Sequence, residues 1–83
     1  MIKIYTATWC GPCHSAKSLL KELNLEFDEI NIEDKNISRE QLYKISGNYT
    51  VPQIFINGKC IGGYTQLLHL HQNNELNKIL NDK

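Results

Sequence analysis

Two cysteines separated by two residues, Cys10 and Cys13, constrain this chain more than any other feature of its sequence. Before them, residues 2–6 form a β-branched and aromatic run that predicts a strand. After them, residues 15–23 carry apolar side chains at helical spacing and predict a helix. The sequence thus places a thiol pair at a strand-to-helix junction, where a disulfide can form and open.

The first backbone N–H groups of a helix lack partners, and the helix dipole favours negative charge at that end. A cysteine at that position is stabilised as a thiolate, which is the nucleophilic form. We therefore expect Cys10, just before the helix, to attack a substrate disulfide. We expect Cys13, one turn further on and less exposed, to resolve the mixed disulfide that results.

Size and charge narrow the classes of function. A chain of 83 residues predicts one domain over residues 1–83. Nine basic and nine acidic side chains cancel, and no basic stripe or long apolar run is present, so we expect neither a nucleic-acid nor a membrane partner. The sequence opens without a leader pattern, and we expect a monomeric cytoplasmic protein. In that reducing compartment, a close cysteine pair is more often catalytic or metal-binding than structural.

Two other uses of the cysteine pair are compatible with its spacing. A zinc site would need two more ligands, and the chain offers Cys60, His14, His69 and His71 without a second close pair. Cys10, Cys13 and His14 also match the attachment pattern of a c-type haem. A redox pair within a strand–helix–strand pattern is the favoured interpretation.

The remaining elements predict an α/β fold in the order β-α-β-α-β-β-α. A helix joins the first two strands, which should therefore run parallel, and Asn57-Gly58 predicts a hairpin between the last two. Further strands are expected over residues 27–32, 51–56 and 59–61. Further helices are expected from Ser38 to Gly47 and from Thr65 to Leu80, the latter with a possible interruption at Asn73-Asn74. The result is a mixed sheet flanked by helices.

The second of these helices has a clear start and end. Ser38 is a good N-cap, and Gln41 three residues later can close a capping box. Leu42 and Ile45 are expected to face inward, and Gly47 ends the helix.

Several short motifs, in order and at family spacing, make the whole chain resemble the glutaredoxins, within the thioredoxin-like fold. They are Ile4-Tyr5-Thr6, Cys10-x-x-Cys13-His14 with Ala16-Lys17, the run from Thr50 to Ile56, and Ile61-Gly62-Gly63-Tyr64. The resemblance implies a four-stranded mixed sheet and a Pro52 that is cis and faces the dithiol. It also implies that the Val51 backbone pairs with an extended substrate, that glutathione is the reducing co-substrate, and that no cofactor is bound permanently.

The resemblance also assigns roles to residues. It implies that Cys10 and Cys13 are catalytic and form the redox disulfide. The expected groove for substrate or glutathione is lined by Trp9, Pro12, Thr50, Val51, Pro52, Gly63, Tyr64 and Thr65.

The chain departs from the family pattern in three places. Trp9-Cys10-Gly11-Pro12-Cys13 looks like the active site of thioredoxin. Ala7 stands where a lysine often helps to hold a glutathione carboxylate. Thr65 and Gln66 follow Tyr64 where the family usually supplies an aspartate for the γ-glutamyl end.

The predicted function is a glutathione-dependent thiol–disulfide oxidoreductase that reduces protein and mixed disulfides with both thiols. The alternative is a thioredoxin-like redoxin that is reduced by thioredoxin reductase and donates electrons to ribonucleotide reductase. A further alternative is a glutathione-ligated iron–sulfur cluster that bridges two chains through Cys10.

Overall fold

The sheet at the centre of the molecule is mixed, with the strand order β2-β1-β3-β4. The structure is a computed structural model, and it describes residues 1–81. Strand β1 pairs in parallel with β2 and antiparallel with β3, and β3 pairs antiparallel with β4. The strands are β1 (Ile2–Thr6), β2 (Asp28–Asn31), β3 (Gln53–Ile56) and β4 (Lys59–Gly62). The predicted fold class, with its parallel first pair and its final hairpin, is confirmed.

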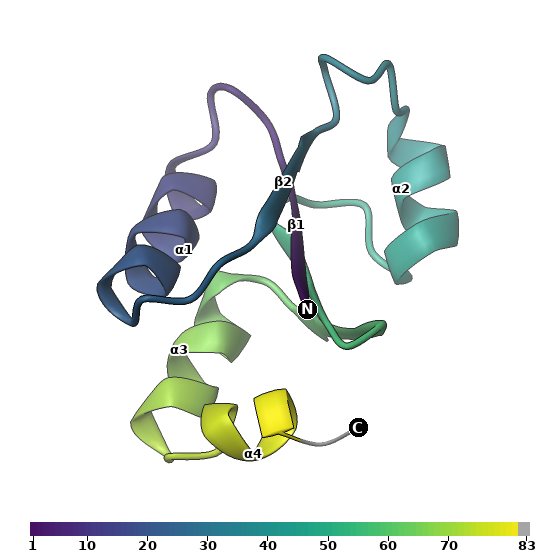
Figure 1. Cartoon of the computed structure of the whole chain (residues 1–83). Coiled ribbons are helices and arrows are strands. Elements are labelled where there is room, and N and C mark those ends of the chain that lie inside the picture. Colours follow the sequence, from purple (N-terminus) through teal and green to yellow (C-terminus); the bar gives the residue numbers. More distant parts are fainter. Residues whose placement is uncertain (82–83) are drawn as a thin grey trace.

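The helices lie on both faces of this sheet. They are α1 (Gly11–Glu22), α2 (Arg39–Ser46), α3 (Tyr64–Gln72) and α4 (Leu76–Asn81). Figure 1 shows α2 alone on one side of the strands, with α1, α3 and α4 on the other. This arrangement follows from the alternation of side chains along each strand, which supplies an apolar row to each face.

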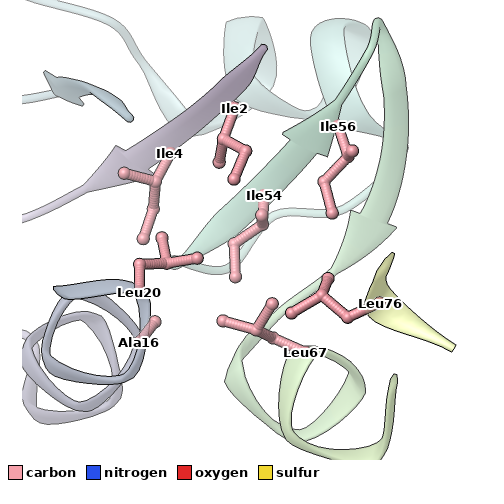
Figure 2. Close-up of a cluster of buried hydrophobic side chains, with 8 residues drawn as sticks. All are labelled: Ile2, Ile4, Ala16, Leu20, Ile54, Ile56, Leu67 and Leu76. Carbon is pink, nitrogen blue, oxygen red and sulfur yellow. The ribbon is translucent and has the colours of Figure 1, made fainter. Parts of the chain in front are cut away.

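The larger core lies under α1 and α3. It is built from alternate residues of β1 and β3 and from buried leucines and an alanine of the helices (Figure 2): Ile2, Ile4, Ala16, Leu20, Ile54, Ile56, Leu67 and Leu76. A smaller cluster lies under α2 and includes the two cysteines: Ala7, Cys10, Cys13, Ile32 and Leu42. The dithiol is therefore packed into the hydrophobic interior on its inner side.

Several element boundaries differ from those predicted. Helix α1 begins at Gly11 and not at Ser15, because Cys10 serves as its N-cap and Pro12 is compatible with a first helical turn. Helix α3 begins at Tyr64 with Gly63 as its N-cap, and not with Thr65 as the cap. Gln66 Oε1 accepts a hydrogen bond from the Gly63 N–H at 2.9 Å, which fixes the start of the helix at this point.

The last helical region is two helices. Asn73 ends α3 and Asn74 takes a positive φ of 59°, so the expected interruption at this pair is confirmed.

Two strands are shorter than expected. Strand β3 starts only at Gln53, since Pro52 has no N–H to give to the sheet. Strand β2 is likewise shorter than expected. Ile45, expected to face inward, is 43% exposed, because the short helix α2 buries only Leu42.

Within residues 1–81, no helix has the length and apolar character that a membrane span requires.

Helix α2 has the complete cap that the sequence predicted. Ser38 Oγ accepts the Gln41 N–H at 3.1 Å, and Gln41 Oε1 accepts the Ser38 N–H at 2.8 Å. Gly47 ends the helix with a backbone in the left-handed region.

Ser38→Ala should lower the free energy of unfolding by about 1 kcal/mol, because loss of the hydroxyl leaves the Gln41 N–H unpaired. Urea denaturation measures it. The control Ser18→Ala, on the exposed surface of α1, should change stability by less than about 0.5 kcal/mol, and an equal effect of both would contradict the capping argument.

Candidate active site at the start of helix α1

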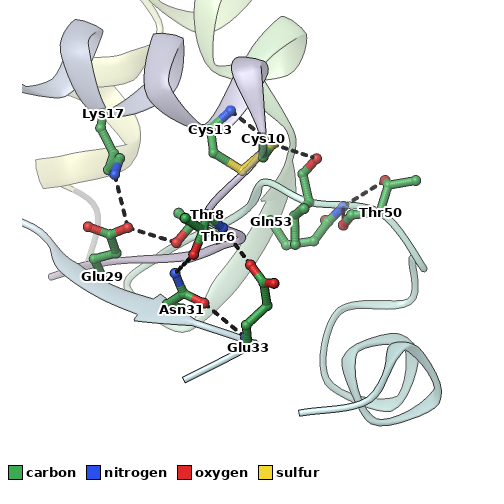
Figure 3. Close-up of a disulfide and its surroundings, with 11 residues drawn as sticks. Thr6, Thr8, Cys10, Cys13, Lys17, Glu29, Asn31, Glu33, Thr50 and Gln53 are labelled. Atoms are coloured by element: carbon green, nitrogen blue, oxygen red, sulfur yellow. Dashed lines mark hydrogen bonds and ion pairs between the residues drawn. A yellow bond between two sulfur atoms is a disulfide. The ribbon is translucent and has the colours of Figure 1, made fainter. Parts of the chain in front are cut away.

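The two cysteines meet at the first turn of α1. They form a disulfide, and their Cα atoms are 5.2 Å apart. Cys10 has an extended backbone, with φ −86° and ψ 111°, and its Sγ accepts the backbone N–H of Cys13 at 3.2 Å. The sulfur thus occupies the place of the side-chain oxygen in an ordinary N-cap. Figure 3 shows this contact and the disulfide beside it.

A sulfur in that position is set up to carry negative charge. When the disulfide opens, the Cys13 N–H and the positive end of the helix dipole remain directed at Cys10 Sγ, and both favour the thiolate. Cys13 is the less exposed of the two, as expected, with 1% exposed against 3% for Cys10. The disulfide form buries both residues, because Leu42 of α2 and Val51 pack against them. Position therefore distinguishes the two thiols better than their exposed fractions do, because Cys10 is the N-cap of α1 and Cys13 lies inside its first turn.

A segment 40 residues away covers the dithiol. The Val51–Pro52 peptide bond is cis, as the family resemblance implies, and the Val51 carbonyl oxygen lies 3.5 Å from Cys10 Sγ. Pro52 is buried and lines the same surface as Pro12. This contact places the segment of residues 50–52 next to the reacting sulfur.

Gln53 holds this segment in place, a role that no motif in the sequence indicates. The residue is 3% exposed. The Nε2 group donates to the Thr50 carbonyl oxygen at 2.8 Å, and Oε1 accepts from Asn48 Nδ2 at 3.3 Å. Cys60 Sγ, a free and partly buried thiol, lies 3.5 Å from the same Oε1. A buried amide with both ends occupied makes the turn before Pro52 rigid.

A hollow of about 280 Å³ runs beside the disulfide. All the predicted groove residues line it except Trp9, and Asn48, Gln53, Gly62 and Gln66 line it as well. Gly63 lets the start of α3 approach the Pro52 segment across the hollow, because a Cβ at this position would lie only 3.3 Å from the Pro52 carbonyl oxygen. None of the residues that line the hollow is an Asp, Glu, Lys, Arg or His.

Trp9 lies outside this hollow and is 64% exposed. The guanidinium carbon of Arg39, at the start of α2, lies 5.8 Å from the centre of the indole ring, within the range of a cation–π contact. Nothing in the local sequence marks Arg39 as a site residue, and only the fold brings it to Trp9.

A polar network ties α1 to the sheet below the dithiol (Figure 3). Thr6 Oγ1 donates to Glu29 Oε2 at 2.7 Å, and Lys17 Nζ lies 3.0 Å from the same oxygen. The hydrogen bond from Thr6, followed by that from Lys17, lowers the pKa of the Glu29 carboxyl below its usual value. Lys17, which could have acted on the Cys10 thiolate, is thus engaged with Glu29.

The described residues contain no group of three or more His, Cys, Asp or Glu side chains placed to hold a metal ion. Cys60, for example, contacts Gln53 and not the cysteine pair.

The family model described as Glutaredoxin matches residues 2–61 of this chain. The chain is 40% identical over 79 residues to glutaredoxin 3 of Escherichia coli K12, with 95% of each chain covered. It is also 40% identical over 84 residues to the chloroplastic monothiol glutaredoxin-S12 of Arabidopsis thaliana. That match covers 95% of this chain and 46% of the plant protein, so the chain spans about half of its length.

Solved structures show the same relationship. A buckwheat glutaredoxin–glutathione complex matches with a TM-score of 0.85 and 29% identity, covering 95% of this chain and 74% of that one. The holo form of glutaredoxin C1 from Populus tremula x tremuloides matches with a TM-score of 0.87 and 32% identity, covering 95% and 81%.

The Glu29 network should make stability depend on pH. Because the folded-state pKa of Glu29 is lowered, its contribution is present above the pKa of the unfolded chain and is lost as pH falls through the folded value. Glu29→Gln should therefore destabilise the protein at pH 7, by less than about 1 kcal/mol since the pair is exposed, and should have little effect at about pH 2.

Urea denaturation across this pH range tests the expectation. Asp28→Asn is the control, because it removes a carboxylate from the same strand that forms no ion pair with residues 1–81. An equal pH dependence in both variants would contradict a specific role of Glu29.

Proposed function

The chain belongs to the glutaredoxin family and is a thiol–disulfide oxidoreductase, and we propose that it draws its electrons from glutathione through Cys10 and Cys13. The observation that carries this proposal is the Cys10 sulfur at the N-cap of α1, beside the cis-Pro52 segment and the hollow. The buckwheat relative is a complex with glutathione, which supports the same ligand here. We place the reaction in the cytoplasm, where a glutathione pool would regenerate the dithiol.

The proposed cycle moves two electrons. The Cys10 thiolate attacks one sulfur of a substrate disulfide, forms a mixed disulfide and releases one substrate thiol. Cys13 Sγ, one turn along the same helix, then attacks Cys10 Sγ and releases the second thiol. Two molecules of glutathione reopen the Cys10–Cys13 disulfide and leave as glutathione disulfide. The substrates are disulfide-containing proteins and mixed disulfides.

The hollow suggests how glutathione is held. The backbone of Val51 is available to pair with the cysteinyl part of an extended tripeptide. Tyr64 and Thr65, the first residues of α3, line the same hollow, and their backbone N–H groups suit a carboxylate, because a helix N-terminus favours an anion. Since the lining carries no charged side chain, recognition rests on the backbone and on shape.

A second electron donor is favoured by one specific observation. Trp9-Cys10-Gly11-Pro12-Cys13 is the thioredoxin-like sequence, and it lies at the start of α1. In the second candidate function, thioredoxin reductase reduces the disulfide, and ribonucleotide reductase is one acceptor.

Millimolar reduced glutathione should reduce the oxidised protein, and the fluorescence of Trp9, the only tryptophan, follows the reaction. With glutathione disulfide as the oxidant, Cys13→Ser should form a mixed disulfide of Cys10 with glutathione and release one glutathione thiolate, visible by mass spectrometry, and the reaction should stop there since the resolving thiol is missing. Cys10→Ser should form no such adduct. If dithiothreitol reduces the protein but glutathione does not, the glutathione proposal is wrong, and reduction by NADPH with thioredoxin reductase would support the second candidate.

Thr65→Asp should speed the reduction by glutathione about fivefold, because a carboxylate at the start of α3 can pair with the α-ammonium of the γ-glutamyl end. N-acetylglutathione, which lacks that ammonium, should not gain. Thr65→Asn is the neutral control of the same shape. A similar gain with both thiols, or with both variants, would mean that the γ-glutamyl end does not lie at Thr65.

A further inference from the structure

Exposed aromatic side chains gather on the surface next to the dithiol but outside the hollow. Trp9, Tyr43 and Tyr49 are 64%, 46% and 53% exposed, and they come from three separate segments of the chain. The rings of Tyr43 and Tyr49 stack at 4.5 Å between centroids. Arg39 connects them to Trp9, since its guanidinium lies over the indole and its Nη1 donates to the Tyr49 carbonyl oxygen at 2.8 Å. We call Trp9, Arg39, Tyr43 and Tyr49 the aromatic strip.

The strip and the hollow are different surfaces. No member of the strip lines the hollow, and the two surfaces adjoin at two places: at Tyr49, whose neighbours Asn48 and Thr50 line the hollow, and at Trp9, which directly precedes Cys10. A ligand as small as glutathione can fill the hollow without touching Tyr43, which is connected to Trp9 only through Tyr49 and Arg39. A larger substrate whose disulfide reaches Cys10 would cover the strip as well.

The composition of the strip matches that of binding hot spots. Trp, Tyr and Arg dominate the binding energy of protein interfaces, because their large rigid groups bury much area at little entropic cost. Exposed aromatic residues held together by specific contacts are also unusual on a surface with no partner. These features favour a polypeptide partner with an apolar side chain over a small disulfide.

Arg39 adds a charge preference. Within residues 1–81, no carboxylate lies at ion-pair distance from its guanidinium, which donates one N–H to Tyr49. A guanidinium has five N–H donors, so it retains donors for an external carboxylate. An acidic residue near the substrate disulfide would therefore find its counter-charge at the centre of the strip.

We propose that the aromatic strip docks protein substrates that carry an apolar side chain and a carboxylate within a few residues of the disulfide. The inference rests on the proposed function, because it assumes that Cys10 attacks the docked disulfide. The reaction is the one already described: the dithiol loses two electrons and becomes the Cys10–Cys13 disulfide, and the substrate disulfide gains them and becomes two thiols.

The test compares substrates of different size and charge. The reduced protein is mixed with two disulfide-closed peptides of one length, one with Phe and Glu beside its cysteines and one with Ser and Lys. The small disulfide of 2-mercaptoethanol is the third probe. Stopped-flow fluorescence of Trp9 measures each rate constant. The wild type should react at least about fivefold faster with the Phe/Glu peptide than with the Ser/Lys peptide.

Tyr43→Ala should remove most of this preference and leave the rate with the small disulfide within about twofold, since Tyr43 lies outside the hollow. Tyr43→Phe keeps the stacked ring and should behave as the wild type. Ile45→Ala is the matched control, because it removes an equally exposed apolar side chain from α2 at a position two residues away, on another face of the helix.

Three results would overturn the proposal: no preference in the wild type, an unchanged preference in Tyr43→Ala, or an equal loss with all three probes. The last would mean that the Tyr43–Tyr49 stack only supports the segment before Pro52. These results leave the proposed function intact as long as glutathione reduces the oxidised protein. If the wild type oxidises with none of the probes, the proposed attack by Cys10 fails, and the docking proposal fails with it.

Discussion

The contact between the Cys10 sulfur and the Cys13 N–H is the interaction on which the rest of the site depends. It makes Cys10 the cap of α1, which brings the start of the helix four residues closer to β1 than the apolar pattern alone suggests. The two cysteines lie three residues apart at the start of this helix, so their side chains meet on one face, and the helix dipole is directed at the Cys10 sulfur. The cap, the disulfide and the activation of the thiolate thus have one structural origin. A replacement at Cys10 would alter the helix start as well as the chemistry.

The surroundings of this cap separate two tasks. Toward Pro52 and α3 lies a hollow with backbone groups and no charged side chain, held rigid by the buried amide of Gln53. Toward α2 lies an exposed strip with aromatic rings and one cation. A tripeptide thiol suits the first surface, and a protein suits the second. Both surfaces adjoin Cys10, the hollow through Val51 and the strip through Trp9, so in the proposed cycle the reductant and the substrate use the same sulfur in successive half-reactions.

Much of the fold and part of the site followed from sequence patterns. The order of the elements, the parallel β1–β2 pair and the capping box at Ser38 were predicted correctly because each depends on local spacing or on a short connection. The family resemblance named eight groove residues, and all except Trp9 line the hollow, which also has lining residues that the resemblance did not name: Asn48, Gln53, Gly62 and Gln66. The wrong predictions concern ends of elements and exposure. Gly63, and not the expected Thr65, is the N-cap of α3, because the Gln66 side chain accepts a hydrogen bond from the Gly63 N–H. Ile45 is exposed and does not face the core as expected, because α2 is short.

The sequence by itself determined the thiol pair, its place between a strand and a helix, and the apolar periods that build the two clusters of the core. These properties belong to neighbouring residues, and helix and strand geometry convert them directly into structure. Only the tertiary structure decided that Val51 and Gln53 lie at the dithiol, that Lys17 is engaged by Glu29, and that Arg39 lies over Trp9. Each of these contacts joins segments that lie far apart in the chain. They exist because the strand order β2-β1-β3-β4 places the ends of several segments around one helix start, and no local pattern contains that order.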